Sequence, residues 1–368
     1  MEVAGVIQHI QERQHILAQR RVTLGFDGFI DTIAKIIKDK GAQNETLFFP
    51  KIQDFGHYVL DKSASSFSLE VAEQNVKLGG NMPITAHALS SLGVPVNCVG
   101  ALGYPRIHPV FEHLAPNGQM YSFAEPGYAT AYEFDNGKMM LAQMEHLNQL
   151  GWAAIVEKIG LDTLIQLFSN SDLWTILNWS EIDASSNIWR GLLTDVVPKC
   201  QPKNPAIALF DLSDCSKRSD EAILEMLELL QQFSKNAQVI LSLNNNEARR
   251  ILQCFMATNL TELLEIGTSL YPFLRLPTLL IHSAQHTFCI TNDRVYSCTS
   301  FWTAHPKLST GAGDHFSAGM AAAQLMQLDW ESALIFANAV AGCYVRSGSS
   351  PTLDEVVRFL TTTSHANQ

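Results

Sequence analysis

The residues best suited to chemistry lie near the C-terminus, within residues 308–323 (LSTGAGDHFSAGMAAA). Gly311 and Gly313 flank an alanine, and Asp314 follows before a run of small and apolar residues, which predicts a tight loop opening a buried helix. The N–H groups of such a loop and the positive end of the helix dipole suit a phosphate or a developing oxyanion. A carboxylate here repels an anionic ligand unless it has a task, such as deprotonating a hydroxyl that attacks phosphorus.

This stretch resembles the Gly-Ala-Gly-Asp motif near the C-terminus of the ribokinase-like (PfkB) sugar kinases. The resemblance implies that Asp314 is the general base. It also implies that the amides of Gly311, Ala312 and Gly313 stabilise charge on the moving phosphoryl group. Taken in isolation, the same residues also fit a glycine turn followed by an ordinary helix cap at Asp314.

Two further carboxylates, Asp27 and Asp31, follow a short buried strand predicted at 21–26. In open α/β sheets, ligands bind at the carboxyl ends of the strands. Ribokinase-like enzymes carry a substrate-binding Asp just after their first strand, and by its spacing to the next residues Asp31 resembles it better than Asp27 does. A turn cap is an equally good interpretation of Asp27.

A double glycine, Gly79 and Gly80, opens a predicted helix that ends at Gly93. The stretch resembles the first conserved block of the same family, which implies that the two glycines help to hold the acceptor. The asparagine usual in the middle of that block is Ile84 here, and Asn81 is a candidate for the lost polar contact. The alternative is an ordinary crossover from a strand through glycine to a helix.

Candidate nucleotide and metal residues lie further along the chain. Asn244 and Glu247 match the family's Asn-x-x-Glu motif, which implies that they organise Mg²⁺ and water around the phosphates. The alternative is an Asn-rich helix cap with Glu247 in the first turn. Asn338, in a predicted helix at 330–345, is a candidate contact to the purine base or a buried packing residue.

Three segments depart from the family pattern. The segment at Tyr104 lacks the expected Asp and final Gly, and the turn at Ser283 lacks both of its usual glycines. Leu308 stands where many relatives carry an Asp linked to activation by monovalent cations, so we expect no potassium site of that kind. These departures motivate an alternative function, that of a non-catalytic sugar- or nucleotide-binding protein that keeps the fold.

The elements that position these residues alternate between strands and helices. Apolar strands are predicted at 173–177, 206–211, 238–243 and 278–282, with helical segments between them. Asn136-Gly137 is the strongest hairpin signal in the chain. The pattern and the resemblance predict one ribokinase-like α/β domain over 1–368. It is a three-layer α/β/α fold with a mostly parallel central sheet and a small β lid at roughly 34–70 and 120–145.

Composition excludes several other classes. The chain has 368 residues, is 46% hydrophobic and carries a net charge of −11 without a cluster of Lys and Arg, which argues against nucleic-acid binding. No apolar run is long enough to span a bilayer, and the seven cysteines form no C-x-x-C pair, as in a reduced cytoplasmic protein. P-loop, dinucleotide-binding and zinc motifs are missing.

The sequence therefore predicts a kinase that uses ATP or ADP, with Mg²⁺, to phosphorylate a hydroxymethyl group of a sugar or nucleoside. The lids of such kinases often pair, which leaves a homodimer through the lid open. The choice of acceptor and of nucleotide also stays open, because specificity resides in the lid and in the segments that depart from the pattern.

Overall fold

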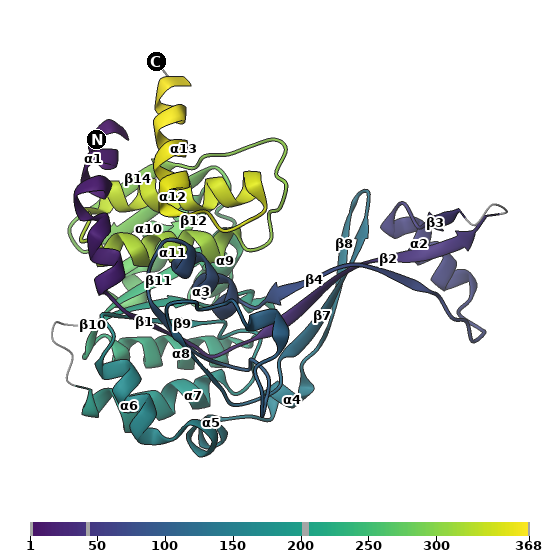
Figure 1. The fold of residues 1–368 in the computed structure, drawn as a ribbon, viewed down its shortest axis with the longest axis horizontal. Coiled ribbons are helices and arrows are strands. Elements are labelled where there is room, and N and C mark those ends of the chain that lie inside the picture. The colour runs from purple at the N-terminus through teal and green to yellow at the C-terminus, as the bar shows by residue number, and fades with distance from the viewer. Residues whose placement is uncertain (1–2, 42–44, 201–205, 367–368) are drawn as a thin grey trace.

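A large, mostly parallel sheet forms the body of the molecule in the computed structural model, which describes residues 3–41, 45–200 and 206–366 (Figure 1). Its strand order is β14-β13-β12-β11-β10-β9-β1-β5-β6. Neighbours from β6 to β12 are parallel, whereas β13 and β14 are antiparallel to the strands beside them. These strands are β1 (Val22–Gly25), β5 (Val96–Gly100), β6 (Gln119–Ser122), β9 (Leu173–Leu177), β10 (Ala206–Asp211), β11 (Ala237–Asn244), β12 (Thr278–His282), β13 (His286–Thr291) and β14 (Val295–Thr299).

Helices cover both faces of this sheet. One apolar core joins a face of the sheet to α1, α3, α11, α12 and α13, and a second core joins the other face to α5–α10. Because the strands are buried on both faces, they read in the sequence as continuous apolar runs. The predicted three-layer α/β/α arrangement is thus confirmed. The helices are α1 (Val3–Arg13), α3 (Asn81–Ser91), α4 (Glu145–Asn148), α5 (Trp152–Ile159), α6 (Leu161–Ser169), α7 (Ser185–Gly191), α8 (Asp220–Phe233), α9 (Asn245–Gln253), α10 (Leu263–Leu274), α11 (Ala312–Leu325), α12 (Trp330–Ser347) and α13 (Leu353–Ala366).

A second sheet projects from the body as a long arm (Figure 1). Its strands are β2 (Phe29–Lys40), β3 (Thr46–Phe48), β4 (Val71–Gly79), β7 (Gly127–Phe134) and β8 (Gly137–Gln143). The order is β3-β2-β7-β8, with β4 paired to β2, and we call this sheet the lid. The β7–β8 hairpin turns at Asn136-Gly137, as predicted.

The lid boundaries differ from those expected. The arm begins at Phe29 and returns through Gly79, and it carries a helix, α2 (Ile52–Asp61), near its far end. The predicted lid segment began at about residue 120, but residues 119–122 form β6 of the large sheet. The short alternating runs of this region gave no periodicity that separates lid strands from an edge strand of the body.

None of the described helices is long and apolar enough to cross a membrane. All seven cysteines carry free thiols, and those at 98, 215 and 289 are buried in the apolar cores.

Candidate active site

Polar side chains gather at the carboxyl edge of the large sheet. Asp27 follows β1, Asn178 follows β9, Asp211 ends β10 and Asn244 ends β11. Parallel strands in one sheet bring these positions to a common edge. Helix α11 begins at the same place, because Ser317 in its second turn donates to the Asp211 carboxylate at 3.0 Å.

Asp314 lies in the first turn of α11 and is only 8% exposed. The residue at the cap position is Gly311, whose φ of 92° suits glycine, and no side chain caps this helix. Asp314 is therefore not the ordinary cap considered as an alternative. Its Oδ1 atom is buried and has no hydrogen-bond partner within the described parts of the chain. Such an atom is costly to bury, and a ligand hydroxyl would satisfy it.

The pKa of Asp314 is raised well above its ordinary value. Burial is the largest cause, and the carboxylates of Asp211 and Asp27 add to it, whereas the Asn81 side chain acts in the opposite direction. A base is most effective when its pKa approaches the working pH, so this environment makes Asp314 a stronger proton acceptor than a free aspartate.

The loop before α11 presents only some of its amides. The Ala312 N–H donates to Ser309 O at 3.2 Å within a turn. The N–H groups of Gly311 and Gly313 have no such partner among the described residues, and Gly313 lines a cavity. In this conformation Gly311 and Gly313, more than Ala312, are the amides open to an anion.

Asp27 is a structural residue of the site. It is fully buried, and it accepts hydrogen bonds from the N–H groups of Asn81 and Met82 at 2.8 Å and from Asn178 Nδ2 at 2.7 Å. Burial, partly offset by these bonds, raises its pKa to about 6. A Cβ on Gly80 would lie 2.6 Å from Asp27 Oδ2, so the second glycine makes room for this carboxylate. Asp27 thereby anchors the start of α3.

Asp31 lies on β2 opposite Lys77 of β4. A Cβ on Gly79 would lie 2.2 Å from Asp31 Oδ1, so the first glycine gives this carboxylate its place. Burial raises the pKa of Asp31, and the ammonium groups of Lys77 and Lys138 oppose that rise. Each of the two glycines thus adjoins one carboxylate. The resemblance to the family had implied instead that both glycines help to hold the acceptor.

The lid contacts the loop of α11 directly, because Lys138 of β8 donates to Thr310 Oγ1. The two predicted carboxylates also act on one neighbouring group. Burial, followed by the carboxylates of Asp314 and Asp31, raises the pKa of the Tyr344 hydroxyl. Both carboxylates therefore lie near the loop of α11, which the lid contacts at Thr310.

Asn244 and Glu247 bond to each other in a capping box at the start of α9. Asn244 Oδ1 accepts from the Glu247 N–H at 3.0 Å, and the Glu247 carboxylate accepts from the Asn244 N–H at 2.9 Å. Burial, followed by the charge of Asp211, raises the pKa of Glu247 well above its ordinary value. The helix-cap interpretation is thus correct for the geometry of both residues. Their predicted role in holding Mg²⁺ stays a prediction.

In the described parts of the chain, no three His, Cys, Asp or Glu side chains lie close enough to hold a metal ion. Oxygen donors are nevertheless available, since the buried Asn245 Oδ1 has no partner among the described residues and Asn244 lines the adjacent cavity. This donor set fits a hydrated Mg²⁺ carried by nucleotide phosphates better than an all-protein cage.

The cavity beside the loop has a volume of about 540 Å³, a size typical of small-ligand sites. Its lining carries no Asp, Glu, Lys or Arg: it consists of Asn244, Asn245, Asn246, His282, Ser283, Ala284, Thr287, Ser300, Phe301, Trp302, Thr303, Pro306, Ser309, Ala312, Gly313, Phe316, Asn338, Ala341, Gly342 and Val345. The Asn338 amide already donates to Thr287 Oγ1 and Leu334 O, so its side chain is held in place as a packing residue.

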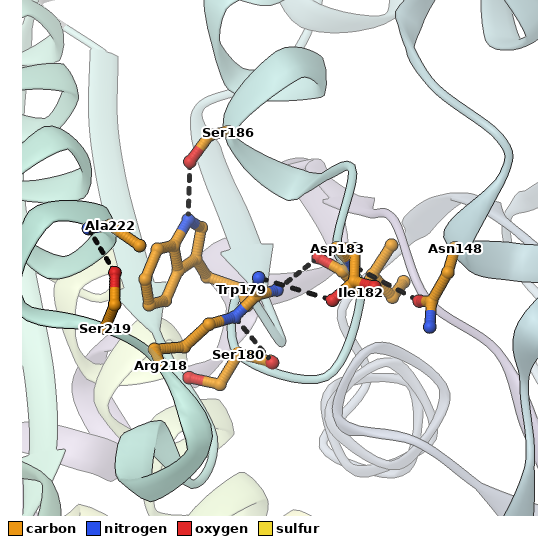
Figure 2. A network of polar contacts seen from close by, with 9 residues as sticks. All are labelled: Asn148, Trp179, Ser180, Ile182, Asp183, Ser186, Arg218, Ser219 and Ala222. Atoms are coloured by element: carbon orange, nitrogen blue, oxygen red, sulfur yellow. Dashed lines mark hydrogen bonds and ion pairs between the residues drawn. The ribbon is translucent and has the colours of Figure 1, made fainter.

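Arg218 holds the loop that follows β9 (Figure 2). Its guanidinium donates to the carbonyls of Trp179, Ser180 and Ile182, pairs with Asp183 at 3.4 Å and lies 4.9 Å from the Trp179 ring. Five donors in a planar group suit such a loop. This contact set holds residues 179–183 beside the carboxyl edge of the sheet.

Asn178 is a residue of this edge that sequence reasoning missed. It has a φ of 56°, it is 2% exposed, and its Oδ1 has no partner in the described structure. A polar residue directly after an apolar strand was the available signal. Lys77, Lys138 and Tyr344 were also missed, because their positions depend on pairings between distant segments.

Comparison with known proteins places the chain among kinases. A family model described as prokaryotic ketohexokinase matches residues 4–362. The ketohexokinase of Haloferax volcanii is 29% identical over 341 residues, which cover 92% of this chain and 90% of that protein.

Solved structures show the same fold at low identity. Arabidopsis thaliana ribokinase, complexed with ribose and ATP, superposes with a TM-score of 0.65 at 18% identity and covers 93% of this chain and 98% of its own. Adenosine kinase from Sinorhizobium meliloti gives a TM-score of 0.64 at 16% identity, with 94% and 99% covered. The predicted ribokinase-like fold and family are therefore confirmed.

Proposed function

Because the chain belongs to the prokaryotic ketohexokinase family, we propose that it transfers the terminal phosphoryl group of ATP to a hydroxymethyl group of a ketohexose. The observation that carries this proposal is the unpartnered Asp314 Oδ1, buried beside a loop with free amides at a helix N-terminus. A binding protein has no need of a base in an anion site. The related Haloferax volcanii protein is called a ketohexokinase, which supports a ketohexose as acceptor.

In the proposed reaction Asp314 takes the proton of the acceptor hydroxyl as its oxygen attacks the terminal phosphorus of ATP. The bond between that phosphorus and the bridging oxygen breaks, and ADP leaves. The free amides of Gly311 and Gly313 stabilise the charge on the moving group. Asp31, with Gly79 at its side, accepts hydrogen bonds from other hydroxyls of the sugar. Gly80 and Asn81 support this acceptor site through Asp27, whose carboxylate accepts from the Asn81 N–H.

The neutral cavity lined by Trp302 and Asn338 takes the nucleotide, and its phosphates point to the loop at Gly313. Asn244 and Glu247 would hold Mg²⁺ through water. The bound ion would neutralise phosphate charge in a site already crowded with carboxylates. ATP is the proposed donor. A putative ribokinase II from E. coli with the same fold was solved with ATP and Mg²⁺, and it supports this choice by fold alone.

The lid supplies a reason to expect a homodimer. Several large apolar side chains on it and on the segment 49–70 between its strands are exposed, and they are Leu47, Ile52, Leu60, Phe67, Val71, Val76, Tyr128, Met140 and Leu141. Exposed apolar surface of this kind is typical of an interaction site when its side chains are contiguous. We therefore include pairing through the lid in the proposal, with analytical ultracentrifugation as its test.

The experiment that tests the function is a coupled ADP-release assay with ATP, Mg²⁺ and a panel of ketohexoses, aldohexoses, pentoses and nucleosides. We expect turnover with at least one ketohexose at more than ten times the kcat/KM of any aldohexose or nucleoside. Preference for another acceptor class would overturn the ketohexose assignment.

The second candidate function is a sugar- or nucleotide-binding protein without activity. The altered segments at Ile84, Tyr104 and Ser283 favour it, and Ser283 lines the nucleotide cavity. Calorimetry would then give binding of ATP or a sugar, while the assay gives no ADP above the rate without protein.

A further inference from the structure

Two consecutive carbonyl groups of the catalytic loop are held by side chains from outside it. The Tyr344 hydroxyl, on α12, donates to Thr310 O at 2.7 Å. His315 Nδ1 lies 2.7 Å from Gly311 O. The rings of the two residues stack on each other, with centroids 3.6 Å apart and planes 14° from parallel. They therefore form one unit behind the loop.

The chemistry of Gly311 O fixes the protons of this unit. A carbonyl oxygen only accepts, so His315 Nδ1 carries the proton and Nε2 is left as an acceptor. Ser350 Oγ, 2.9 Å from Nε2, must then donate to it, and Ser350 in turn accepts from His87 Nδ1 at 2.8 Å. Burial lowers the pKa of His315 to about 4, which keeps the imidazole neutral and this direction in force.

The same contacts decide where the amides of the loop point. In a planar trans peptide the C=O and N–H groups point in opposite directions, so holding Thr310 O turns the Gly311 N–H away from Tyr344. Thr310 O is also the carbonyl that the Asp314 N–H would take as its helical partner. No bond between those two is present in the described structure, where Tyr344 takes that carbonyl.

We propose that Tyr344 and His315 are positioning residues that hold the loop amides in place for phosphoryl transfer without touching either reactant. The inference rests on the proposed function. Tyr344 keeps the proton that it donates, because burial and the carboxylates of Asp314 and Asp31 raise its pKa. Lys138 secures the same residue, Thr310, from the lid side.

The test removes one hydroxyl. In Tyr344→Phe the ring still stacks on His315, and we expect kcat to fall about tenfold, with KM for sugar and nucleotide changed less than about twofold. Hydrogen exchange should become faster in the peptide spanning 309–316. The matched control is Tyr271→Phe, which removes a tyrosine bond to the carbonyl of Pro277 at 3.0 Å outside the site.

A second pair of variants tests His315. The backbone N–H of residue 315 donates to Gly311 O at 3.1 Å in every variant. Asn at this position keeps the second, side-chain donor for Gly311 O and Leu does not, so His315→Asn should retain most of the kcat that His315→Leu loses. Unchanged kcat in Tyr344→Phe, or a fall in kcat without faster exchange at 309–316, would overturn the proposal. The exchange measurement needs no turnover, so it stays decisive even if the parent protein phosphorylates none of the sugars.

Discussion

The two halves of the site differ in the charge of their side chains. The half that we propose for the acceptor collects carboxylates: Asp27, Asp31, Asp211 and Asp314 are all buried or half-buried there, and burial raises the pKa of each. The half that we propose for the nucleotide is a cavity whose lining carries no acidic or basic side chain except His282, which burial keeps neutral by lowering its pKa to about 4.

This difference separates chemistry from binding. Under the proposed function, an anionic nucleotide would meet backbone amides and neutral surface, and its charge would be balanced by the loop, the helix end and a divalent cation. A neutral sugar would meet carboxylates, which would accept hydrogen bonds from its hydroxyls and take up its proton. The proposal places Asp314 at the border of the halves, where a base serves both reactants.

The comparison predicts that a change at Gly79 harms only the acceptor half. In Gly79→Ala the new Cβ would lie 2.2 Å from Asp31 Oδ1, so this carboxylate must move. A misplacement of about 1 Å costs about 100-fold, and we expect kcat/KM for the sugar to fall by that factor with the affinity for ATP unchanged. Steady-state kinetics with each reactant varied in turn will measure both.

Gly56→Ala is the matched control, because a Cβ at Gly56 on α2 meets nothing within 4 Å. It should leave all kinetic constants within about twofold. Loss of ATP affinity in Gly79→Ala would show that the halves are not separate.

A change at Trp302 should harm only the nucleotide half. Trp302 lines the cavity and is 58% exposed, so its removal costs the protein little packing. In Trp302→Ala we expect KM for ATP to rise about tenfold, as for the loss of one stacking contact, with KM for the sugar unchanged. Phe273→Ala, on an exposed aromatic residue outside the cavity, is the control. Equal effects on both reactants would contradict the division.

The smallest expected effect is on stability. Since the folded-state pKa of Asp314 is raised, its charged form is disfavoured in the native protein, and stability falls as the pH rises through that pKa. An uncharged amide escapes this cost. Asp314→Asn should therefore raise Tm at pH 7.5 by a few degrees, with the difference shrinking towards pH 4. Calorimetric scans from pH 4 to pH 7.5 will measure this difference in Tm. A lower Tm for Asp314→Asn at pH 7.5 would contradict the claim that the charged Asp314 destabilises the folded protein.

Much of the fold follows from the sequence. The strands at 173–177, 206–211 and 278–282 were predicted to the residue, because strands buried on both faces are continuous apolar runs that end at polar residues. The lid was placed less well. Its outer strands β3 and β8 are mostly exposed, so they lack the continuous apolar runs of the body strands, and the helix Ile52–Asp61 contains no buried residue.

The local structure around the candidate residues was predictable where these residues lie within one motif. Asp314 and its loop share four consecutive positions, and the Asn244–Glu247 box shares a helix start. The roles of Asp27 and Gly80 were not predictable, because they depend on a contact between the segment after β1 and the start of α3 that no local pattern records.

Residues that act across the fold escaped for the same reason. Tyr344 meets the loop from a distance of 34 positions, and Lys138 meets it from 172 positions away. Neither distance carries a sequence signature, so only the packed structure brings them together.

The most direct test of the account is a single-turnover measurement of phosphoryl transfer in Asp314→Asn, with ATP and the sugar both saturating. We expect the rate to fall about 10³-fold or more while both reactants still bind within about threefold of their parent affinities. Asp162→Asn, at an exposed carboxylate in the first turn of α6, should transfer at the parent rate. A rate for Asp314→Asn within about tenfold of the parent would contradict the claim that this carboxylate takes the proton.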